Sequence, residues 1–245
     1  WNLKDKTVVI TGATNGIGKA AALELAKQSP KLLLTFRNQE LADNLLAEIK
    51  TAAPDVSVEL IYCDFSMQSS IRECSKEIIA SQDKIDVLIN NAGVVNTSYH
   101  ETSEGIENTF AVNHLGYFLF TNLLLNKMKG PEESRIINVS SAAHSFVKDM
   151  NWENINFKDD FGQGMQVYGQ SKLAGEEIAL EYSQSIPLTV IRPPLVYGPR
   201  EENFFTFIKL IRNGWGLQIG RAGKELSLIY VSDLVEAMLA ASDPT

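Results

Sequence analysis

Short apolar runs alternate along the chain with longer segments in which apolar residues recur every three or four positions. In most of these runs apolar residues follow one another directly and do not alternate with polar ones, which is typical of strands covered on both faces. Strands are therefore predicted at Thr7–Ile10, Leu32–Phe36, Ser57–Tyr62, Val87–Asn90, Arg135–Val139 and Leu188–Arg192. The helical segments between them are Gly16–Gln28, Gln39–Thr51, Gln68–Ala80, Thr109–Lys127 and Tyr168–Tyr182. This alternation predicts an α/β fold with a Rossmann-like doubly wound parallel sheet, whose ligand lies beyond the carboxyl ends of the strands.

The pattern changes after Arg192. The stretch "RPPLVYGPREENFFTF" contains three prolines and leads into a predicted helix near Phe204–Asn213 and a glycine-spaced loop. A last helical segment, "DLVEAMLAASD", follows near the end of the sequence. We expect residues 1–245 to form a single dinucleotide-binding and catalytic domain, with a small C-terminal substrate lobe around 197–228.

Composition narrows the class of protein. The net charge of -8 argues against nucleic acid and anionic membrane surfaces as partners, because no basic stripe offsets it. Cys63 and Cys74 are the only cysteines, and they form neither a metal-binding pattern nor a disulfide framework. No apolar run approaches the roughly 18 residues that span a bilayer. We therefore expect a cytoplasmic location, and because the chain begins at Trp1, a targeting or anchor segment before it stays open.

A glycine-rich turn joins the first strand to the first helix. In "VVITGATNGIGKAAALELA", Gly12, Gly16 and Gly18 allow a tight turn and let backbone N–H groups approach a pyrophosphate. Thr14, Asn15 and Ile17 complete the predicted phosphate contacts of this turn. The spacing is G-x-x-x-G-x-G and departs from the general dinucleotide fingerprint, so an ordinary loop and helix cap is the alternative interpretation.

The end of the second strand bears on cofactor choice. An acidic residue there typically hydrogen-bonds the ribose 2′-hydroxyl of NAD, but this sequence has Phe36, Arg37 and Asn38 instead. The guanidinium of Arg37 suits a 2′-phosphate because its planar fork pairs with phosphate oxygens. NADP(H) is therefore favoured, with NAD(H) as the second choice and a solvated surface arginine as the alternative.

Tyr168 and Lys172 stand four residues apart in "VYGQSKLAGEE" and share one face of a helix. The pKa of a phenol is near 10, and a neighbouring ammonium favours the phenolate, which brings this pKa toward neutrality. The pair therefore suits general acid–base chemistry. The alternative is a tyrosine and a lysine on an ordinary solvated helix face.

Other motifs accompany this pair in a fixed order. "RIINVSSAAH" ends a predicted strand with Ser140 and Ser141, "LINNAG" ends another, and "FAVNHLG" places Asn113 inside a helix, where it interrupts the helical hydrogen bonds or holds a water. Together with the glycine turn, this ordered set resembles the short-chain dehydrogenase/reductase family over essentially the whole chain.

The resemblance implies four catalytic residues. Tyr168 is then the general acid/base on the carbonyl or hydroxyl oxygen, and Lys172 lowers its pKa and binds the nicotinamide ribose. Ser141 hydrogen-bonds the substrate oxygen, and Asn113 supports a proton-relay water beside Lys172.

The resemblance also implies cofactor contacts along the strand ends. On the adenosine side these are Asp64, Phe65, Asn91, Ala92 and Gly93. On the nicotinamide side they are Pro193 and Val196, in "RPPLV", together with Tyr168 and Lys172.

Two branches of the family share the resemblance. Residues 1 to about 165 resemble retinol-dehydrogenase-like members, which act on apolar carbonyls and alcohols. From about Tyr168 onward, "YGQSKLAGEE", "LTVIRPPLVYGPR" and "LIYVSDLVEAMLAA" resemble the extended branch of sugar-nucleotide epimerases and dehydratases. This split suggests a hybrid chain, engineered or mosaic.

The leading hypothesis is an NADP(H)-dependent oxidoreductase that interconverts a carbonyl and an alcohol of a small-molecule substrate. The alternatives are an epimerase- or dehydratase-like enzyme, a dinucleotide-binding protein without turnover, and a serine hydrolase that uses Ser141 with His144. The hydrolase lacks the G-x-S-x-G turn. No ligand spacing relates the three histidines, so no metal site is expected. The oligomeric state stays open, and because family members often pair through the helices that contain Asn113 and Tyr168, a homodimer is the candidate.

Overall fold

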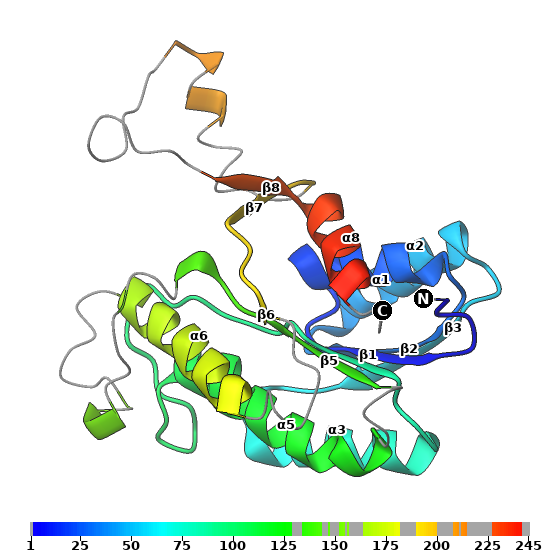
Figure 1. Cartoon of the computed structure of the whole chain (residues 1–245), viewed down its shortest axis with the longest axis horizontal. Helices are drawn as coiled ribbons and strands as arrows, with labels where there is room; N and C mark the ends of the chain where they lie inside the picture. The colour runs from blue at the N-terminus through cyan, green and yellow to red at the C-terminus, as the bar shows by residue number, and fades with distance from the viewer. Residues whose placement is uncertain are drawn as a thin grey trace.

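A parallel six-stranded sheet lies at the centre of the described part of the chain (Figure 1). The structure is a computed structural model, and it describes residues 2–128, 134–143, 147, 152–154, 156, 164–181, 190–199, 208–210, 212–214 and 227–241. The strand order is β3-β2-β1-β4-β5-β6. The strands β2 and β3 are thus added on one side of β1, and the strands from β4 onward are added on its other side, so the order reverses between β1 and β4. The strands are β1 (Thr7–Ile10), β2 (Lys31–Phe36), β3 (Ser57–Tyr62), β4 (Val87–Asn90), β5 (Arg135–Val139) and β6 (Val190–Ile191).

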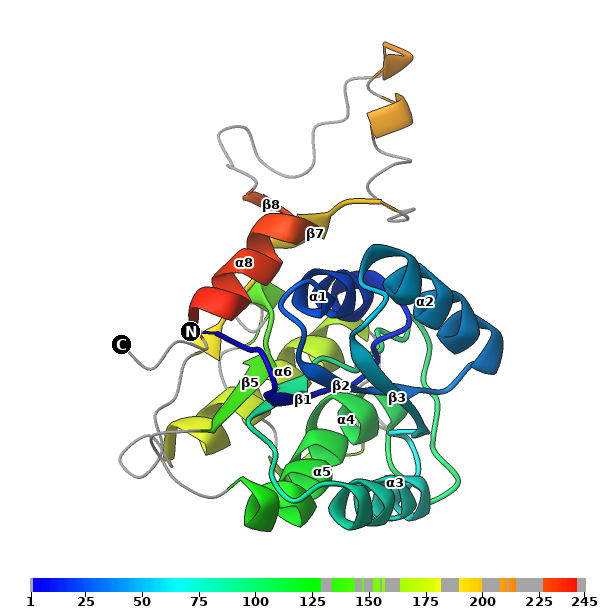
Figure 2. The same cartoon turned by 90° about the vertical axis from the view of Figure 1, so that its right-hand side faces the viewer.

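Helices cover both faces of this sheet (Figures 1 and 2). One face carries α1 (Gly16–Ala26), α2 (Gln39–Ala52) and α8 (Val231–Ala241). The other face carries α3 (Gln68–Ser81), α5 (Gly116–Leu124) and α6 (Gly164–Glu181). The predicted α/β fold with a doubly wound parallel sheet is confirmed.

The two helical layers explain why the strands read as continuous apolar runs. Val8 and Ile10 of β1 belong to the core beneath α1, whereas Val9 between them belongs to the core beneath α3 and α5. Successive side chains of a strand point to opposite faces, so a strand covered on both sides must be apolar at every position. All three side chains are fully buried.

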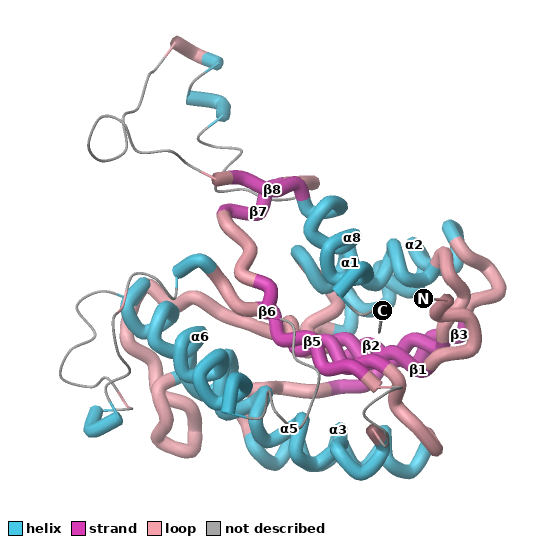
Figure 3. Tube along the Cα trace, viewed as in Figure 1, coloured by secondary structure: helices cyan, strands magenta, loops and turns pink. Residues whose placement is uncertain are grey.

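A second, two-stranded parallel sheet follows β6. It consists of β7 (Leu195–Tyr197) and β8 (Leu228–Tyr230), and it lies apart from the central sheet, next to α8 (Figure 3). The rings of Tyr197 and Tyr230 pack edge to face across it, with centroids 5.3 Å apart. Most of the predicted substrate lobe around 197–228, and of the predicted helix near Phe204–Asn213, lies outside the described residues.

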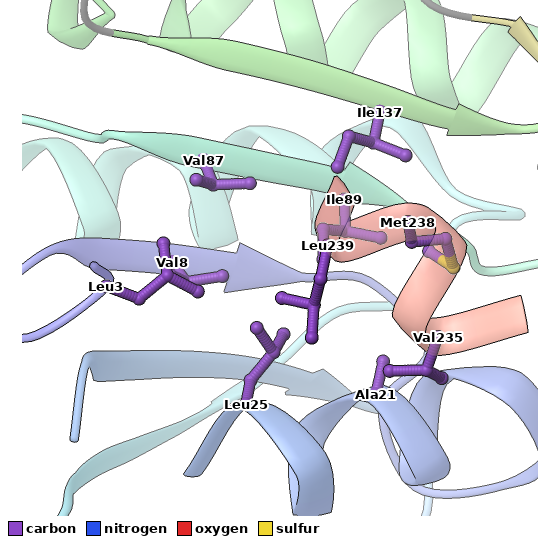
Figure 4. Close-up of a pocket in the computed structure, with 10 residues that line it drawn as sticks. All are labelled: Leu3, Val8, Ala21, Leu25, Val87, Ile89, Ile137, Val235, Met238 and Leu239. Carbon is purple, nitrogen blue, oxygen red and sulfur yellow. The ribbon is translucent and has the colours of Figure 1, made fainter. Parts of the chain in front are cut away.

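The apolar contact between α8 and the sheet leaves only a very small crevice (Figure 4). Its volume is about 10 Å³, which is at the lower limit for a single water molecule. The lining is entirely apolar and consists of Leu3, Val8, Ala21, Leu25, Val87, Ile89, Ile137, Val235, Met238 and Leu239. This region closes the core and offers no room for a ligand.

The predicted helix Thr109–Lys127 is interrupted. It divides into α4 (Asn108–Phe110), a π-helical turn (Ala111–Leu115), α5, and a 3₁₀ turn (Leu125–Lys127). Asn113 lies in the π turn, which is consistent with the expected interruption of the helical hydrogen bonds at this residue. α6 begins at Gly164, one turn before the predicted start at Tyr168. No helix among the described residues is long and apolar enough to cross a membrane.

Candidate cofactor and catalytic site

A cavity of about 460 Å³ lies at the carboxyl ends of β1 to β4, next to the point where the strand order reverses. It is lined by these residues that the sequence predicts as cofactor contacts: Gly12, Thr14, Asn15, Gly16, Ile17, Arg37, Asn38, Asp64, Phe65, Asn91, Ala92 and Gly93. Phe36, which the sequence places beside Arg37, also lines the cavity. The lining residues that the sequence did not indicate are Thr35, Leu41, Cys63, Val94 and Val112. The sheet thus gathers segments far apart in the sequence around one opening, as expected for a doubly wound fold.

Each of the three glycines in the turn is required for a different structural reason. Gly12 and Gly16 have φ angles of 61° and 53°, in the left-handed region that favours glycine. A Cβ on Gly12 would also lie 2.8 Å from Cα of Ala92. Gly18 does not line the cavity, but a Cβ there would lie 2.4 Å from the carbonyl oxygen of Gly12. Gly18 therefore lets α1 pack against the turn, while Gly12 and Gly16 expose backbone to the cavity.

Two buried threonines fix this turn. Oγ1 of Thr11 accepts hydrogen bonds from the backbone N–H groups of Asn91 and Ala92, at 2.8 and 2.9 Å. Nδ2 of Asn91 donates in return to the carbonyl oxygen of Thr11, at 2.9 Å. Oγ1 of Thr35 accepts from the N–H of Gly12, at 3.2 Å. The ends of β1, β2 and β4 are therefore held together by polar contacts, and both threonines were missed by sequence reasoning.

Arg37 and Asp64 face each other at the cavity. Nη1 of Arg37 lies 4.0 Å from Oδ1 of Asp64, and the Arg37 side chain is 63% exposed. Oδ1 of Asp64 also accepts from the N–H and the hydroxyl of Ser66, at 2.9 and 2.7 Å. Asn38 caps α2 by accepting from the N–H of Leu41, at 3.1 Å. A guanidinium beside a helix N-terminus favours an anion, and a long, exposed ion pair leaves this guanidinium free to bind one.

Tyr168 and Ser141 lie together at the start of α6. Their side chains are hydrogen-bonded, and Oγ of Ser141 also accepts from the N–H of Ala143, at 3.2 Å. A Cβ on Gly169 would lie 2.6 Å from the carbonyl oxygen of Ala143. The absence of a side chain at Gly169 thus allows α6 to touch the segment after β5, which brings the two predicted catalytic hydroxyls into contact.

The protonation of this site differs from the sequence-based expectation. Burial raises the pKa of Tyr168 above its ordinary value, and the hydrogen bond with Ser141 offsets part of this rise. Burial also lowers the pKa of Lys172 to about 8. Nζ of Lys172 donates to the carbonyl oxygen of Val139, at 2.8 Å, and lies 5.7 Å from the centroid of the Tyr168 ring. The pKa of Tyr168 therefore shifts in the direction opposite to the expected one, because desolvation outweighs the hydrogen bond with Ser141.

Asn113 connects the loop after β4 to α6. Its Oδ1 accepts from the N–H of Val94, and its Nδ2 donates to the carbonyl oxygen of Val94, both at 2.9 Å. Nδ2 also lies 3.4 Å from Oγ of Ser171, which donates to the carbonyl oxygen of Tyr168 at 2.7 Å. Since Val94 lines the cavity, these bonds link it to the helix that carries Tyr168 and Lys172. The side chain of Asn113 is committed to this link, and its predicted role in holding a water stays a prediction.

Pro193 and Val196, which were predicted on the nicotinamide side, lie in different parts of the structure. Pro193 is buried, and its carbonyl oxygen accepts from the N–H of Ala142, at 3.1 Å, next to Ser141. Val196 lies in β7, pairs with Ile229 and packs against the core beneath α1 and α8. The structure does not place Val196 in the lining of the cavity, because pairing with β8 draws this segment toward the other sheet. His144, the partner of Ser141 in the hydrolase hypothesis, lies outside the described residues, and the described part contains no group of His, Cys, Asp and Glu that could hold a metal ion.

Comparison with known proteins places this geometry in a family. The family model for the short chain dehydrogenase matches residues 6–152, more than half of the chain. Human retinol dehydrogenase 13 is 41% identical over 173 residues, which cover 69% of this chain and 51% of that protein. Human retinol dehydrogenase 11 is 41% identical over 172 residues, which cover 70% and 54%. The chain therefore spans about half the length of these curated relatives.

Among solved structures, a short-chain dehydrogenase from Sphingobium yanoikuyae in complex with NADPH has the same fold. Its TM-score is 0.68 with 21% sequence identity, and the match covers 96% of this chain and 83% of that one. The predicted likeness to retinol dehydrogenases is confirmed, whereas these comparisons lend no support to an epimerase-like C-terminal part or to a hybrid origin. The chain belongs to the short-chain dehydrogenase family.

Proposed function

We propose that this protein is an NADP(H)-dependent oxidoreductase that interconverts a carbonyl and an alcohol. The observation that carries the proposal is the hydrogen-bonded pair of Tyr168 and Ser141 beside the buried Lys172. The bonds of Asn113 and Ser171 join this pair to a cavity with the features of a dinucleotide site. The relatives that are retinol dehydrogenases favour an apolar aldehyde or alcohol as the substrate.

The cavity fits a dinucleotide. Side chains are absent where Gly12 and Gly16 expose the backbone, and α1 begins there at Gly16, so the positive end of a helix dipole lies beside the cavity. Asn91, Ala92 and Gly93 would hold the adenosine side, and Arg37 would bind a 2′-phosphate. When bound, NADP(H) supplies or accepts a hydride at its nicotinamide ring.

Tyr168 and Lys172 of α6 then carry out and support the proton transfer. In the reductive direction Tyr168 donates its phenolic proton to the substrate oxygen, and Ser141 donates a hydrogen bond to the same oxygen. The raised pKa of Tyr168 keeps this proton in place at neutral pH. Lys172, with a pKa of about 8, is mostly an ammonium at pH 7, and its charge stabilises the phenolate as the proton leaves.

Two measurements in sequence test the proposal. NADPH and NADH are titrated against the protein and followed by fluorescence, and turnover is then measured with a panel of apolar aldehydes and alcohols. We expect tighter binding of NADPH than of NADH, and turnover that Tyr168→Phe abolishes while NADPH binding stays nearly intact. Retained turnover in Tyr168→Phe would assign the acid to another group.

The same measurements separate the alternatives. Binding of NADPH without turnover on any substrate would favour a dinucleotide-binding protein over an enzyme. Turnover only with sugar nucleotides would restore the epimerase- or dehydratase-like hypothesis. Binding of neither cofactor would overturn the proposal.

A homodimer belongs to the same proposal. Phe118 and Leu125, on and just after α5, are 51% and 39% exposed, and Leu180 on α6 is 48% exposed. Single exposed apolar residues are ordinary, but Phe118 and Leu180 lie on the two helices through which family members pair, and Leu125 directly follows one of these helices.

A further inference from the structure

Lys172 is a buried lysine, with 6% of its surface exposed. Its side chain comes from α6 and ends between two aromatic rings, with Nζ 5.2 Å from the centroid of Tyr117 and 5.7 Å from that of Tyr168. Nζ donates a hydrogen bond to the carbonyl oxygen of Val139, whereas an ammonium carries three donors. Both ring distances are within the roughly 6 Å at which a cation is attracted to an aromatic face.

Tyr117 lies on α5, four residues after Asn113, and is 7% exposed. Its hydroxyl is buried and has no hydrogen-bond partner among the described residues. Burial and the neighbouring Tyr168 both raise the pKa of Tyr117, so its phenol stays neutral across the working range of pH. Two phenols therefore lie beside Lys172, one from α5 and one from α6. The buried carboxylate of Glu176 lies one turn further along α6 and is paired with Arg192 and Ser140.

The two rings are not equivalent. Tyr168 hydrogen-bonds Ser141 and changes its protonation in the proposed reaction, whereas Tyr117 keeps one protonation state. We infer that Tyr117 is a positioning residue that holds the Lys172 ammonium against its ring face and keeps this lysine charged beside Tyr168. The consequence for catalysis rests on the oxidoreductase function proposed above.

The test measures the titration of Lys172 directly. Protein labelled with ¹³C at the lysine ε carbon is titrated by NMR without cofactor, and the Lys172 signal is assigned by its loss in Lys172→Met. Tyr117→Leu removes the ring, and Tyr117→Phe keeps the ring while removing the hydroxyl. The matched control is Phe120→Leu, because Phe120 is a buried ring on the same helix that packs against Phe65, with centroids 5.3 Å apart.

We expect Tyr117→Leu to lower the pKa of Lys172 by roughly 0.5 to 1.5 pH units, the shift that corresponds to the loss of one desolvated cation–π contact. Tyr117→Phe should restore the original titration, and Phe120→Leu should leave it unchanged. An unchanged Lys172 titration in Tyr117→Leu, or an equal shift in Phe120→Leu, would overturn the inference.

A shape-preserving change covers the case in which Tyr117→Leu does not fold. Fluorinated phenylalanines at position 117 keep the ring volume and weaken the negative charge of its face. The pKa of Lys172 should fall in steps as fluorine is added, and no trend would contradict the proposal. Turnover then separates the placement of Tyr117 from the proposed oxidoreductase function. The decline in kcat/KM above pH 8 should move to lower pH by the same amount as the pKa of Lys172. A shift seen by NMR without any effect on turnover would support the placement of Tyr117 and argue against the proposed function.

Discussion

Gly169 of α6 lies against the backbone of Ala143, so closely that a Cβ would stand 2.6 Å from the Ala143 carbonyl oxygen. This contact sets the distance between the helix that carries Tyr168 and the segment that carries Ser141. The contact of the two hydroxyls therefore depends on a residue without chemistry of its own.

Gly169→Ala should reduce turnover about ten- to a hundred-fold, because the added methyl must push α6 away from Ser141; overpacking of this kind also destabilises a protein by roughly 1–3 kcal/mol. The control is Gly175→Ala, on the same helix, where a Cβ would make an ordinary contact of 3.5 Å with Nδ1 of His114. Turnover, NADPH affinity and thermal unfolding are compared for both variants. Equal turnover in the two variants would show that the Gly169 contact does not position the hydroxyls.

Arg37→Ser should weaken NADPH binding about ten- to a hundred-fold, since hydrogen bonds to charged groups contribute roughly 1.5–3 kcal/mol. NADH has no 2′-phosphate, and its affinity should change little. Dissociation constants for both cofactors, measured by fluorescence, give the comparison, with the exposed Arg72 of α3 replaced by serine as the control. Equal losses for NADPH and NADH would mean that Arg37 does not distinguish the two.

Much of the fold could be predicted because its strongest constraint is local. A strand covered on both faces must be apolar nearly throughout, and β1 and β4, which are buried in this way, have the predicted bounds. The bounds of β5 and of the edge strand β3 are also as predicted. The glycine turn was also visible, because its left-handed conformations and close contacts demand glycine at fixed positions.

The contacts that assemble the site could not be predicted in this way. Thr11 bonds to Asn91, 80 residues away, and Asn113 reaches Ser171 across 58 residues. The sequence pattern predicts only a strand end at Thr11 and only part of an apolar helix at Tyr117. The pKa of Tyr168 illustrates the same limit, since spacing reveals the nearby lysine but desolvation depends on the packing of α5 and α6.

Phe118→Glu should convert the expected homodimer into a monomer, because a charge at the centre of an apolar interface must be desolvated without a partner. Phe118 is 51% exposed, and Tyr62 on the edge strand β3 is 53% exposed, which makes Tyr62→Glu a matched control. Light scattering after size exclusion gives the mass of each variant. A dimer in Phe118→Glu would place the interface elsewhere, and a monomeric parent protein would remove the expectation.

The buried His114 should make the stability of the folded protein depend on pH. It is buried in the π turn, its ring stacks on Phe110 with centroids 5.0 Å apart, and burial lowers its pKa from 6.5 to about 4. Between these two values the unfolded chain binds a proton that the folded protein does not, so stability falls as the pH decreases from 6.5 toward 4. The full effect below pH 4 is roughly 3 kcal/mol. Above pH 6.5 both states are neutral and the effect vanishes.

Urea unfolding at pH 7 and pH 4.5 measures this loss, and His114→Asn supplies the comparison because an amide does not titrate in this range. The variant should lose less stability than the parent protein between the two pH values, whatever its stability at pH 7. Other groups titrate in the same interval, but their contribution is common to both proteins and cancels in the difference. An identical loss in the two proteins would mean that the folded protein accommodates a charged His114, and the π turn would then have to be open to water.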